Sequence, residues 1–376
     1  MLMEQLIDTR IVEEAQQIAA QTGVLAVLLA GSYARGQASP YSDVDLLAIT
    51  ESGPMRIEIV DVAWTTFDIC YTMMEELEQE IARSFVTCNS MLHLLTLIGD
   101  AIWEQRIETL ARQRYPHYVP QANGLEEERR QVCAAAQHVG VAHATGDRVA
   151  QAQAGGELVW LAGRMCLSLA GIGPVREDQW HELLRTASLP FDAATPLAQW
   201  YLGNGLDERI EAAWTLAERV VGEPLPLIQG DDLLLPAAPA LQARALPDAL
   251  EAVEMHRLIQ AVGFGKMAKA LWMKDDVRQA SEAGVIVWFA VPACLALGGL
   301  VAPEPFWWHE ALCQITLSFD AARFYRHTLL GASFEERKDA ACTLGQRTLE
   351  ALEPLFRNSS YEHKYRRKAV ENKYLK

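Results

Sequence analysis

The first hundred residues combine an amphipathic stretch with several short apolar runs. Residues 7–21 place Ile11, Ala15 and Ile18 on one face, which predicts a helix that ends at Gly23. Short runs of leucine and β-branched residues predict strands at 24–30, 44–50, 57–64 and 66–72, and a helical period returns at 74–85. This order indicates a small mixed sheet with helices on one side, which together form a first domain.

The rest of the chain repeats itself at one fixed offset. The tripeptide Trp180-His181-Glu182 recurs at Trp308-His309-Glu310, and Cys166 recurs at Cys294 by the same displacement. Roughly two dozen of about sixty aligned positions are identical without a gap, which is well beyond chance. The apolar periodicity predicts two copies of an all-helical module, so the expected fold class of the whole chain is α+β.

One uncharged run, residues 285–303, is close to the length that spans a bilayer. Its counterpart in the first copy, residues 158–175, carries Arg164 in its middle. A bilayer would penalise that arginine by a few kcal/mol. Both segments are therefore predicted to be buried helices of a soluble bundle, and no membrane partner is expected.

Segments rich in proline, glycine and alanine divide the chain. The expected organisation is a first domain at 1–115, helical modules at 125–222 and 253–356, a Pro/Ala-rich linker at 223–252, and a basic tail at 357–376.

The charge balance restricts the class of partner. The formal net charge is −16, and no lysine occurs before Lys266. Such a surface repels a phosphate backbone, which argues against nucleic acid as a partner. It suits a cationic small molecule or a metal-bound nucleotide better.

The seven cysteines are scattered and form no CxxC motif, which predicts reduced thiols rather than disulfides or a zinc site. The N-terminus has four acids by Glu14 and no apolar core of a signal peptide. The expected location is the cytoplasm.

Two aspartates, Asp43 and Asp45, flank the start of the predicted strand at 44–50. Residues i and i+2 of a strand point to the same face, so both carboxylates are expected to project from one edge of the sheet. Adjacent carboxylates repel each other unless a cation bridges them, and an oxygen-only pair suits Mg²⁺. Gly31-Ser32, at a strand-to-helix turn, offers backbone N–H groups and a hydroxyl to a phosphate. Taken alone, an Asp-x-Asp pair beside a turn is more often a cap or a solvated strand edge.

The full pattern from Gly31 to Leu46, GSxxRGxxxxxSDxDL, resembles the signature of the DNA polymerase β-like nucleotidyltransferase superfamily. The similarity is to its small bacterial branch, which includes aminoglycoside nucleotidyltransferases and minimal nucleotidyltransferases. The resemblance covers under a third of the chain, all of it in the first domain, and the matching residues are Gly31, Ser32, Arg35, Gly36, Ser42, Asp43 and Asp45. It implies transfer of a nucleoside monophosphate, expected to be AMP from ATP, to a hydroxyl group with release of pyrophosphate.

The superfamily carries a third carboxylate on a later strand, for which this chain has two candidates. Asp68 lies between Phe67 and Ile69 and precedes an acidic helix start, so we prefer it to Asp61. The resemblance implies that Asp43, Asp45 and Asp68 hold two Mg²⁺ ions and act in catalysis. Asp68 is then the group expected to help deprotonate the acceptor hydroxyl.

The remaining signature residues are expected to bind the nucleoside triphosphate. Gly31 and Ser32 would cradle the β- and γ-phosphates, and Ser42 belongs to the same signature. Arg35 is the nearest fixed cation, although it can equally be a surface residue or a salt-bridge partner of Asp43. The other expected partner is a hydroxyl-bearing acceptor, unknown from the sequence, and a homodimer remains an open alternative.

Three functions stay open at this level. The leading one is nucleotidyl transfer to a small molecule, with an aminoglycoside-like cation as one candidate because of the acidic composition. The second is adenylylation of a partner protein, as in toxin–antitoxin pairs. The third is a catalytically silent nucleotide-binding scaffold, against which the complete signature argues. Aminoglycoside nucleotidyltransferases use a glutamate of the helical domain as base, and nothing in this sequence locates its equivalent.

Two features of the helical modules invite a functional interpretation. Shared packing explains the repeated Trp-His-Glu better than catalysis does, because both copies retain it. Arg164, inside an apolar helix, is expected to pair with a buried carboxylate, and contact with a substrate is the alternative.

Overall fold

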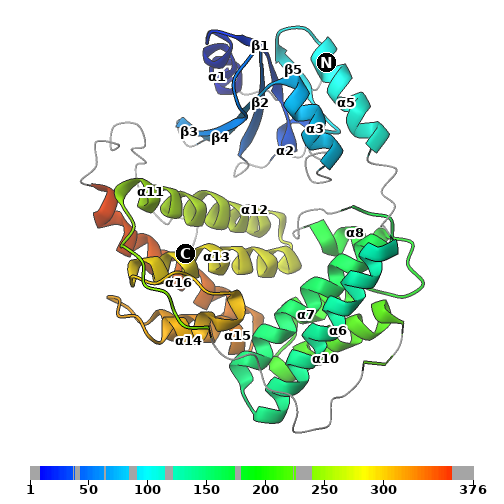
Figure 1. Cartoon of the computed structure of the whole chain (residues 1–376), viewed down its shortest axis with the longest axis vertical. Coiled ribbons are helices and arrows are strands. Elements are labelled where there is room, and N and C mark those ends of the chain that lie inside the picture. The colour runs from blue at the N-terminus through cyan, green and yellow to red at the C-terminus, as the bar shows by residue number, and fades with distance from the viewer. Residues whose placement is uncertain are drawn as a thin grey trace. The chain divides into compact units, whose positions relative to one another are not determined.

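The computed structural model describes residues 9–36, 38, 43–62, 65–83, 91–114, 122–173, 179–222, 224–225 and 239–357. The chain forms two compact units, the first within residues 1–119 and the second comprising the helical part that begins at residue 120 (Figure 1). The first unit holds the strands and the second is helical, so the predicted α+β class is confirmed.

A five-stranded mixed sheet forms the centre of the first unit. Its strand order is β3-β4-β2-β1-β5, with β2 in the middle. β2 runs parallel to β4, and the other neighbours are antiparallel. The strands are β1 (Val24–Leu29), β2 (Val44–Thr50), β3 (Arg56–Val62), β4 (Thr65–Thr72) and β5 (Leu95–Ile98). The four predicted strands are present, whereas β5 was missed because this short segment becomes a strand only by pairing with β1.

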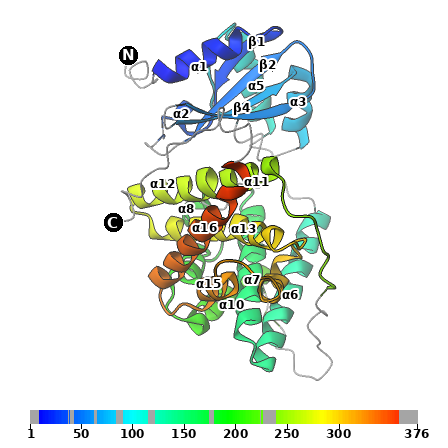
Figure 2. The ribbon, with the colours of Figure 1, turned by 90° about the vertical axis from the view of Figure 1, so that its left-hand side faces the viewer.

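Helices cover both faces of this sheet, so the expectation of helices on one side was wrong (Figures 1 and 2). α1 (Thr9–Ala19) packs on the face that contains Leu46. α3 (Met74–Arg83) and α5 (Ile102–Arg114) pack on the face that contains Leu47. Both leucines are buried, and a strand that is apolar on both sides requires cover on both.

The helices of the second unit recur at the offset found in the sequence. α7 (Arg148–Leu169) is equivalent to α13 (Asp276–Leu297), and both the first and the last residues of the two helices match at this offset. The other pairs are α6 (Ala122–Thr145) with α11 (Ala249–Arg257), η3 (Leu258–Phe264) and α12 (Gly265–Met273), α8 (Trp180–Thr186) with α14 (Trp308–Leu312), α9 (Ala194–Leu202) with α15 (Ala321–Leu330), and α10 (Leu206–Val221) with α16 (Phe334–Arg357). A short 3₁₀ turn, η4 (Pro305–Trp307), precedes α14. We call residues 122–222 the first helical copy and residues 249–357 the second.

The borders of these copies differ slightly from the expected modules. α11 begins at Ala249, inside the segment predicted as a linker at 223–252. Residues 226–238 of that linker and residues 358–376 of the predicted tail lie outside the described part of the chain. The domain division therefore remains our proposal in its details.

Equivalent residues of the two copies make equivalent contacts. Trp180 packs on Trp160 with ring centroids 6.1 Å apart, and Trp308 packs on Trp288 at 5.3 Å. Trp180 and Trp308 are buried, so the repeated Trp-His-Glu supplies its tryptophan to each core. This contact explains the repeat as packing.

The expected ion pair of Arg164 is present. Its Nε lies 3.3 Å from Oε1 of Glu128, and its Nη2 donates to Oε1 of Gln131 at 2.7 Å. Glu128 also accepts a hydrogen bond from the Ser168 hydroxyl at 3.3 Å. Arg164 is thus held within the first helical copy by groups of its own bundle.

In the described part of the chain, α13 is the one helix long and apolar enough to cross a membrane, and 61% of its most apolar window is buried. Its residues Ala290, Val291 and Cys294 belong to the core of the second helical copy. α16 packs along α13, as Figure 2 shows. These contacts account for the apolar run as the core helix of a bundle.

Two buried arginines link the helical copies in a reciprocal manner. Arg337 donates through Nη2 to the Tyr201 carbonyl at 2.8 Å, and Arg209 donates through Nη2 to the Leu329 carbonyl. The repeat makes Arg209 equivalent to Arg337 and Tyr201 equivalent to Leu329. Each copy therefore donates from its arginine to the same backbone position of the other copy. This is the pattern of an isologous interface, here within one chain. Burial, with Arg337 nearby, lowers the pKa of Arg209 to about 9.

We expect Arg337→Met to destabilise the helical unit by about 1–3 kcal/mol, because the change leaves the Tyr201 and Gly331 carbonyls without this donor. Urea unfolding followed by tryptophan fluorescence measures the change. Arg326→Met, at an exposed position of α15, is the control and is expected to stay within about 0.5 kcal/mol. Equal effects of the two substitutions would contradict a role of the reciprocal contact.

A second stability prediction concerns the turn before α13. Lys274 has φ = 54°, and the equivalent residue of the first helical copy is Gly146, with φ = 72°. A side chain in the left-handed region costs about 1–2 kcal/mol, while glycine costs about 0.5–1 kcal/mol in chain entropy. Lys274→Gly is therefore expected to stabilise the unit by about 0.5–1 kcal/mol in the same unfolding assay. Gly146→Lys should have the opposite sign, and a destabilising Lys274→Gly would refute this explanation.

Candidate active site

The register of the central strands brings two of the predicted carboxylates together. β2 pairs with β4 so that Asp45 is the direct partner of Asp68. Neighbouring strands lie about 4.8 Å apart, and paired residues point to the same face. β3 lies between β2 and β4 in the sequence, but β2 and β4 are neighbours in the sheet. Their parallel pairing places the two aspartates side by side.

The face on which these aspartates lie follows from the core. Leu47 and Ile49, two and four residues after Asp45, are in the core beneath α3 and α5, and Cys70, two residues after Asp68, packs against it. Asp45 and Asp68 therefore continue this face toward the N-terminal ends of β2 and β4. Both are half-buried, and Asp43, just before β2, is exposed. Hence the carboxylates lie where the apolar cover of the sheet ends.

Gly31 is in direct contact with this pair of strands. It begins the short helix α2 (Gly31–Ala34) with φ = 65°, in the left-handed region that favours glycine. A Cβ added to Gly31 would lie 1.8 Å from Oδ2 of Asp45. The N–H of Ala30 donates to the Asp45 carbonyl at 2.9 Å, which holds the turn against the strand. The glycine of the signature is required because backbone and carboxylate touch at this point.

Ser32 presents a buried hydroxyl beside that glycine. The residue is 8% exposed, and its Oγ has no hydrogen-bond partner within the described residues. Buried hydroxyl groups are usually hydrogen-bonded, so an orphaned one marks a place for a further polar group. A phosphate oxygen would provide the missing acceptor.

The other predicted site residues are less fully placed. Arg35 follows α2 and is half-buried. Ser42 lies outside the described residues. Asp61 is paired with Thr66 in the register of β3 and β4, while Asp68 is paired with Ile59 on one side and Asp45 on the other. This register favours Asp68 as the third carboxylate, which remains a prediction.

The donor set fits a hard divalent cation bound with a triphosphate. Asp43, Asp45 and Asp68 supply carboxylate oxygens, which Mg²⁺ prefers, and the Ser32 hydroxyl supplies a partner for phosphate. Within the described ranges, no group of three His, Cys, Asp or Glu side chains is already arranged to hold a metal ion. Metal binding by the three aspartates therefore also stays a prediction.

Sequence reasoning missed the steric role of Gly31 against Asp45, because the two residues are well separated along the chain and meet only through the pairing of β1 with β2. The occurrence of Gly31 together with the Asp43-x-Asp45 pair in one signature was the sequence feature that could have indicated this contact. Nor did the sequence reveal the pocket in the first helical copy, which is described below.

The comparison with known families agrees with this geometry. Residues 9–95 match the family described as nucleotidyltransferase domain, so the first unit is a nucleotidyltransferase domain. The resemblance inferred from the signature is confirmed for this part of the chain.

Further comparisons add less. The chain is similar to a solved structure titled as a nucleotidyltransferase-like protein from Exiguobacterium sibiricum 255-15, with 13% identity and a TM-score of 0.37. The similarity covers 56% of this chain and 74% of that one. No curated protein matches the sequence.

Proposed function

We propose that the protein transfers a nucleoside monophosphate, AMP from ATP in the simplest case, to a hydroxyl group of a small molecule. The observation that carries this proposal is the pairing of Asp45 with Asp68 next to the Gly31–Ser32 turn. The turn approaches the carboxylate so closely that only a glycine fits, so a phosphate bound at the turn would lie beside a cation bound at the carboxylate.

Each residue of the site has a distinct task in this proposal. Asp43, Asp45 and Asp68 would hold Mg²⁺. When bound, the metal neutralises charge that develops on the phosphates and lowers the pKa of the acceptor hydroxyl. The Ser32 hydroxyl would donate to a phosphate oxygen, and Arg35, directly after α2, is the signature's cation for the phosphates. Asp68 accepts the proton of the acceptor hydroxyl.

The acceptor is proposed from charge alone. The net charge of −16 favours a cationic molecule, such as an aminoglycoside-like amine with free hydroxyl groups. Adenylylation of a partner protein is the second candidate, because the same chemistry serves any hydroxyl that reaches the site. A silent nucleotide-binding protein is disfavoured by the presence of Asp43, Asp45 and Asp68 together.

Release of pyrophosphate from ATP and Mg²⁺, measured with and without a panel of aminoglycosides, tests the proposal. Turnover that depends on a small acceptor supports it. Labelled AMP on a co-purified protein would support modification of a partner instead. ATP binding without either product would support the silent scaffold and overturn the proposed activity.

A further inference from the structure

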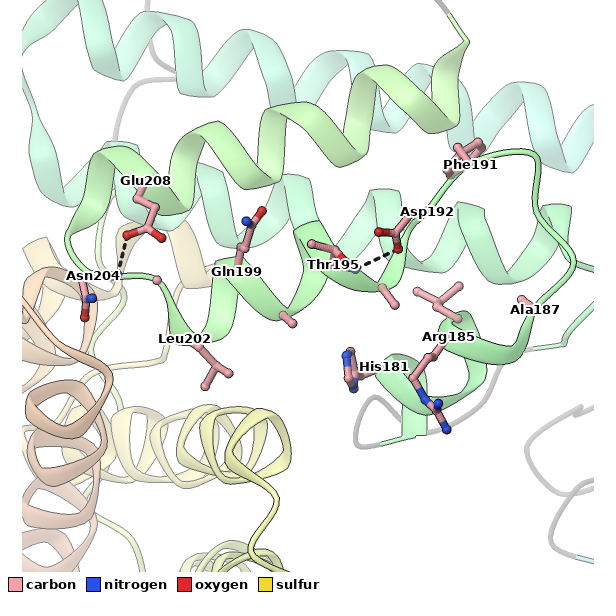
Figure 3. A pocket seen from close by; sticks show the side chains of 14 residues that line it. His181, Arg185, Ala187, Phe191, Asp192, Thr195, Gln199, Leu202, Asn204 and Glu208 are labelled. Carbon is pink, nitrogen blue, oxygen red and sulfur yellow. Dashed lines mark hydrogen bonds between the residues drawn. The ribbon is translucent and has the colours of Figure 1, made fainter.

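A pocket of about 610 Å³ lies in the first helical copy, between α8, α9 and the start of α10. Figure 3 shows His181 and Arg185 of α8 on one side and Thr195 and Gln199 of α9 on the other. The volume is within the range of small-molecule sites, about 300–1,000 Å³. Every residue that lines the pocket belongs to the helical unit, so the pocket does not depend on the nucleotidyltransferase domain.

The second helical copy identifies which lining residues are structural. Asp192 accepts a hydrogen bond from the Thr195 N–H at 3.1 Å, and its equivalent Asp320 accepts one from the Arg323 N–H at 2.9 Å. Likewise, Glu208 of α10 accepts a hydrogen bond from the Asn204 N–H at 2.8 Å. Its equivalent Glu336 of α16 accepts one from the Ala332 N–H at 2.8 Å. Because both copies keep these carboxylates with the same contacts, their role is to hold the helix ends.

Other lining positions carry smaller side chains in the first copy than in the second. Ala187 corresponds to Ile315, Ala198 to Arg326, and Gln199 to His327. The second copy holds a smaller cavity of about 380 Å³, lined by residues 312 and 315–321. The larger pocket of the first copy thus goes with smaller side chains at these positions.

The polar groups that remain available are mostly uncharged. The side-chain amides of Gln199 and Asn204 make no hydrogen bond within the described residues, and each can both donate and accept. Several of the charged or carboxylate groups are already engaged: Arg185 donates to both carboxylate oxygens of Glu182, at 3.0 and 2.7 Å, and Glu208 accepts the Asn204 N–H at 2.8 Å. The Asp192 carboxylate is occupied by Thr195 and faces Arg219. An ionic ligand would therefore meet Arg185 and Asp192 already engaged by other groups, whereas hydroxyl groups match the amides.

We propose that the pocket of the first helical copy binds a small, uncharged, hydroxyl-rich molecule such as a monosaccharide or a cyclic polyol. Phe191 and Leu202, which are partly exposed, provide the apolar surface against which the C–H face of such a ring can pack. The proposal concerns binding and stands whether or not the nucleotidyl transfer proposed above is correct.

The test uses the full-length chain without nucleotide. D-glucose and myo-inositol are titrated to 20 mM by calorimetry and saturation-transfer NMR, with spermidine and inorganic phosphate as charged probes. Saturable binding of a neutral probe is expected, and the substitution Ala198→Arg, which introduces the residue of the second copy, should weaken it at least tenfold. Thr195→Arg is the second variant; it reproduces Arg323, and position 195 is exposed, so the fold should be retained.

The matched control is Arg326→Ala in the second helical copy, which is expected to leave affinity unchanged. Circular dichroism verifies the fold of each variant. Three results would each overturn the proposal: no saturable binding of either neutral probe, binding that both pocket variants leave intact, or displacement by spermidine or phosphate.

Discussion

Asp45→Asn is expected to remove Mg²⁺-dependent ATP binding and to lower the rate of pyrophosphate release by at least about a hundredfold to a thousandfold. Asparagine retains the shape of the side chain that touches Gly31, but it removes the negative charge beside Asp68. The folded domain should therefore persist while the cation is lost. Calorimetric titration of ATP with and without Mg²⁺ measures this directly and requires no acceptor.

The two candidates for the third carboxylate supply the control. Asp68→Asn should reproduce the loss, because Asp68 is the register partner of Asp45. Asp61→Asn, on the edge strand β3 and opposite Thr66, should retain binding. Full activity of Asp45→Asn would remove the basis of the metal assignment, and the reverse ranking of Asp61 and Asp68 would transfer the third role to Asp61.

Gly31→Ala is expected to abolish activity because the added methyl group collides with the Asp45 side chain. The new Cβ would lie 1.8 Å from Oδ2 and 2.7 Å from Cγ of Asp45, so either the turn or the carboxylate must move. The left-handed backbone at φ = 65° adds about 1–2 kcal/mol of destabilisation. ATP titration and thermal unfolding of the same samples separate the loss of the site from the loss of stability.

Gly23→Ala isolates the backbone contribution. Gly23 also has a positive φ, 83°, but an added Cβ would meet no atom within 4 Å. We expect it to lower stability by about 1 kcal/mol and to leave ATP affinity unchanged. If Gly31→Ala bound ATP as well as Gly23→Ala does, the close contact with Asp45 would have no functional importance.

Local patterns predicted most of the first unit because its strands are encoded within a few residues. The runs that become β1, β2, β3 and β4 are apolar and rich in leucine and β-branched residues, and the signature lies between the first two. Strand β5 and the cover on the second face were not predictable in this way. β5 is very short, and its state depends on pairing with β1, which is distant in the sequence.

The candidate site was accessible from the sequence to a limited extent. Asp43 and Asp45 were identified by spacing, and Gly31 and Ser32 by their place at a turn. The choice between Asp61 and Asp68 could not be derived from spacing, since both lie in strand-like segments of similar composition. The register of β2 with β4 distinguishes them, and register is a property of the assembled sheet.

In the helical unit, internal repetition predicted two copies of one helical module without coordinates, because identical residues at one offset are expected to take up similar positions. The chain's own residues thus specified the strands around the signature, the acidic pair and the doubled helical modules. The folded molecule added the neighbours: Asp68 beside Asp45, Gly31 against the Asp45 carboxylate, Arg209 on the Leu329 carbonyl, Arg337 on the Tyr201 carbonyl, and a larger pocket in the first copy than in the second. These contacts join residues far apart in the sequence, and local propensities carry no information about which distant segments will meet.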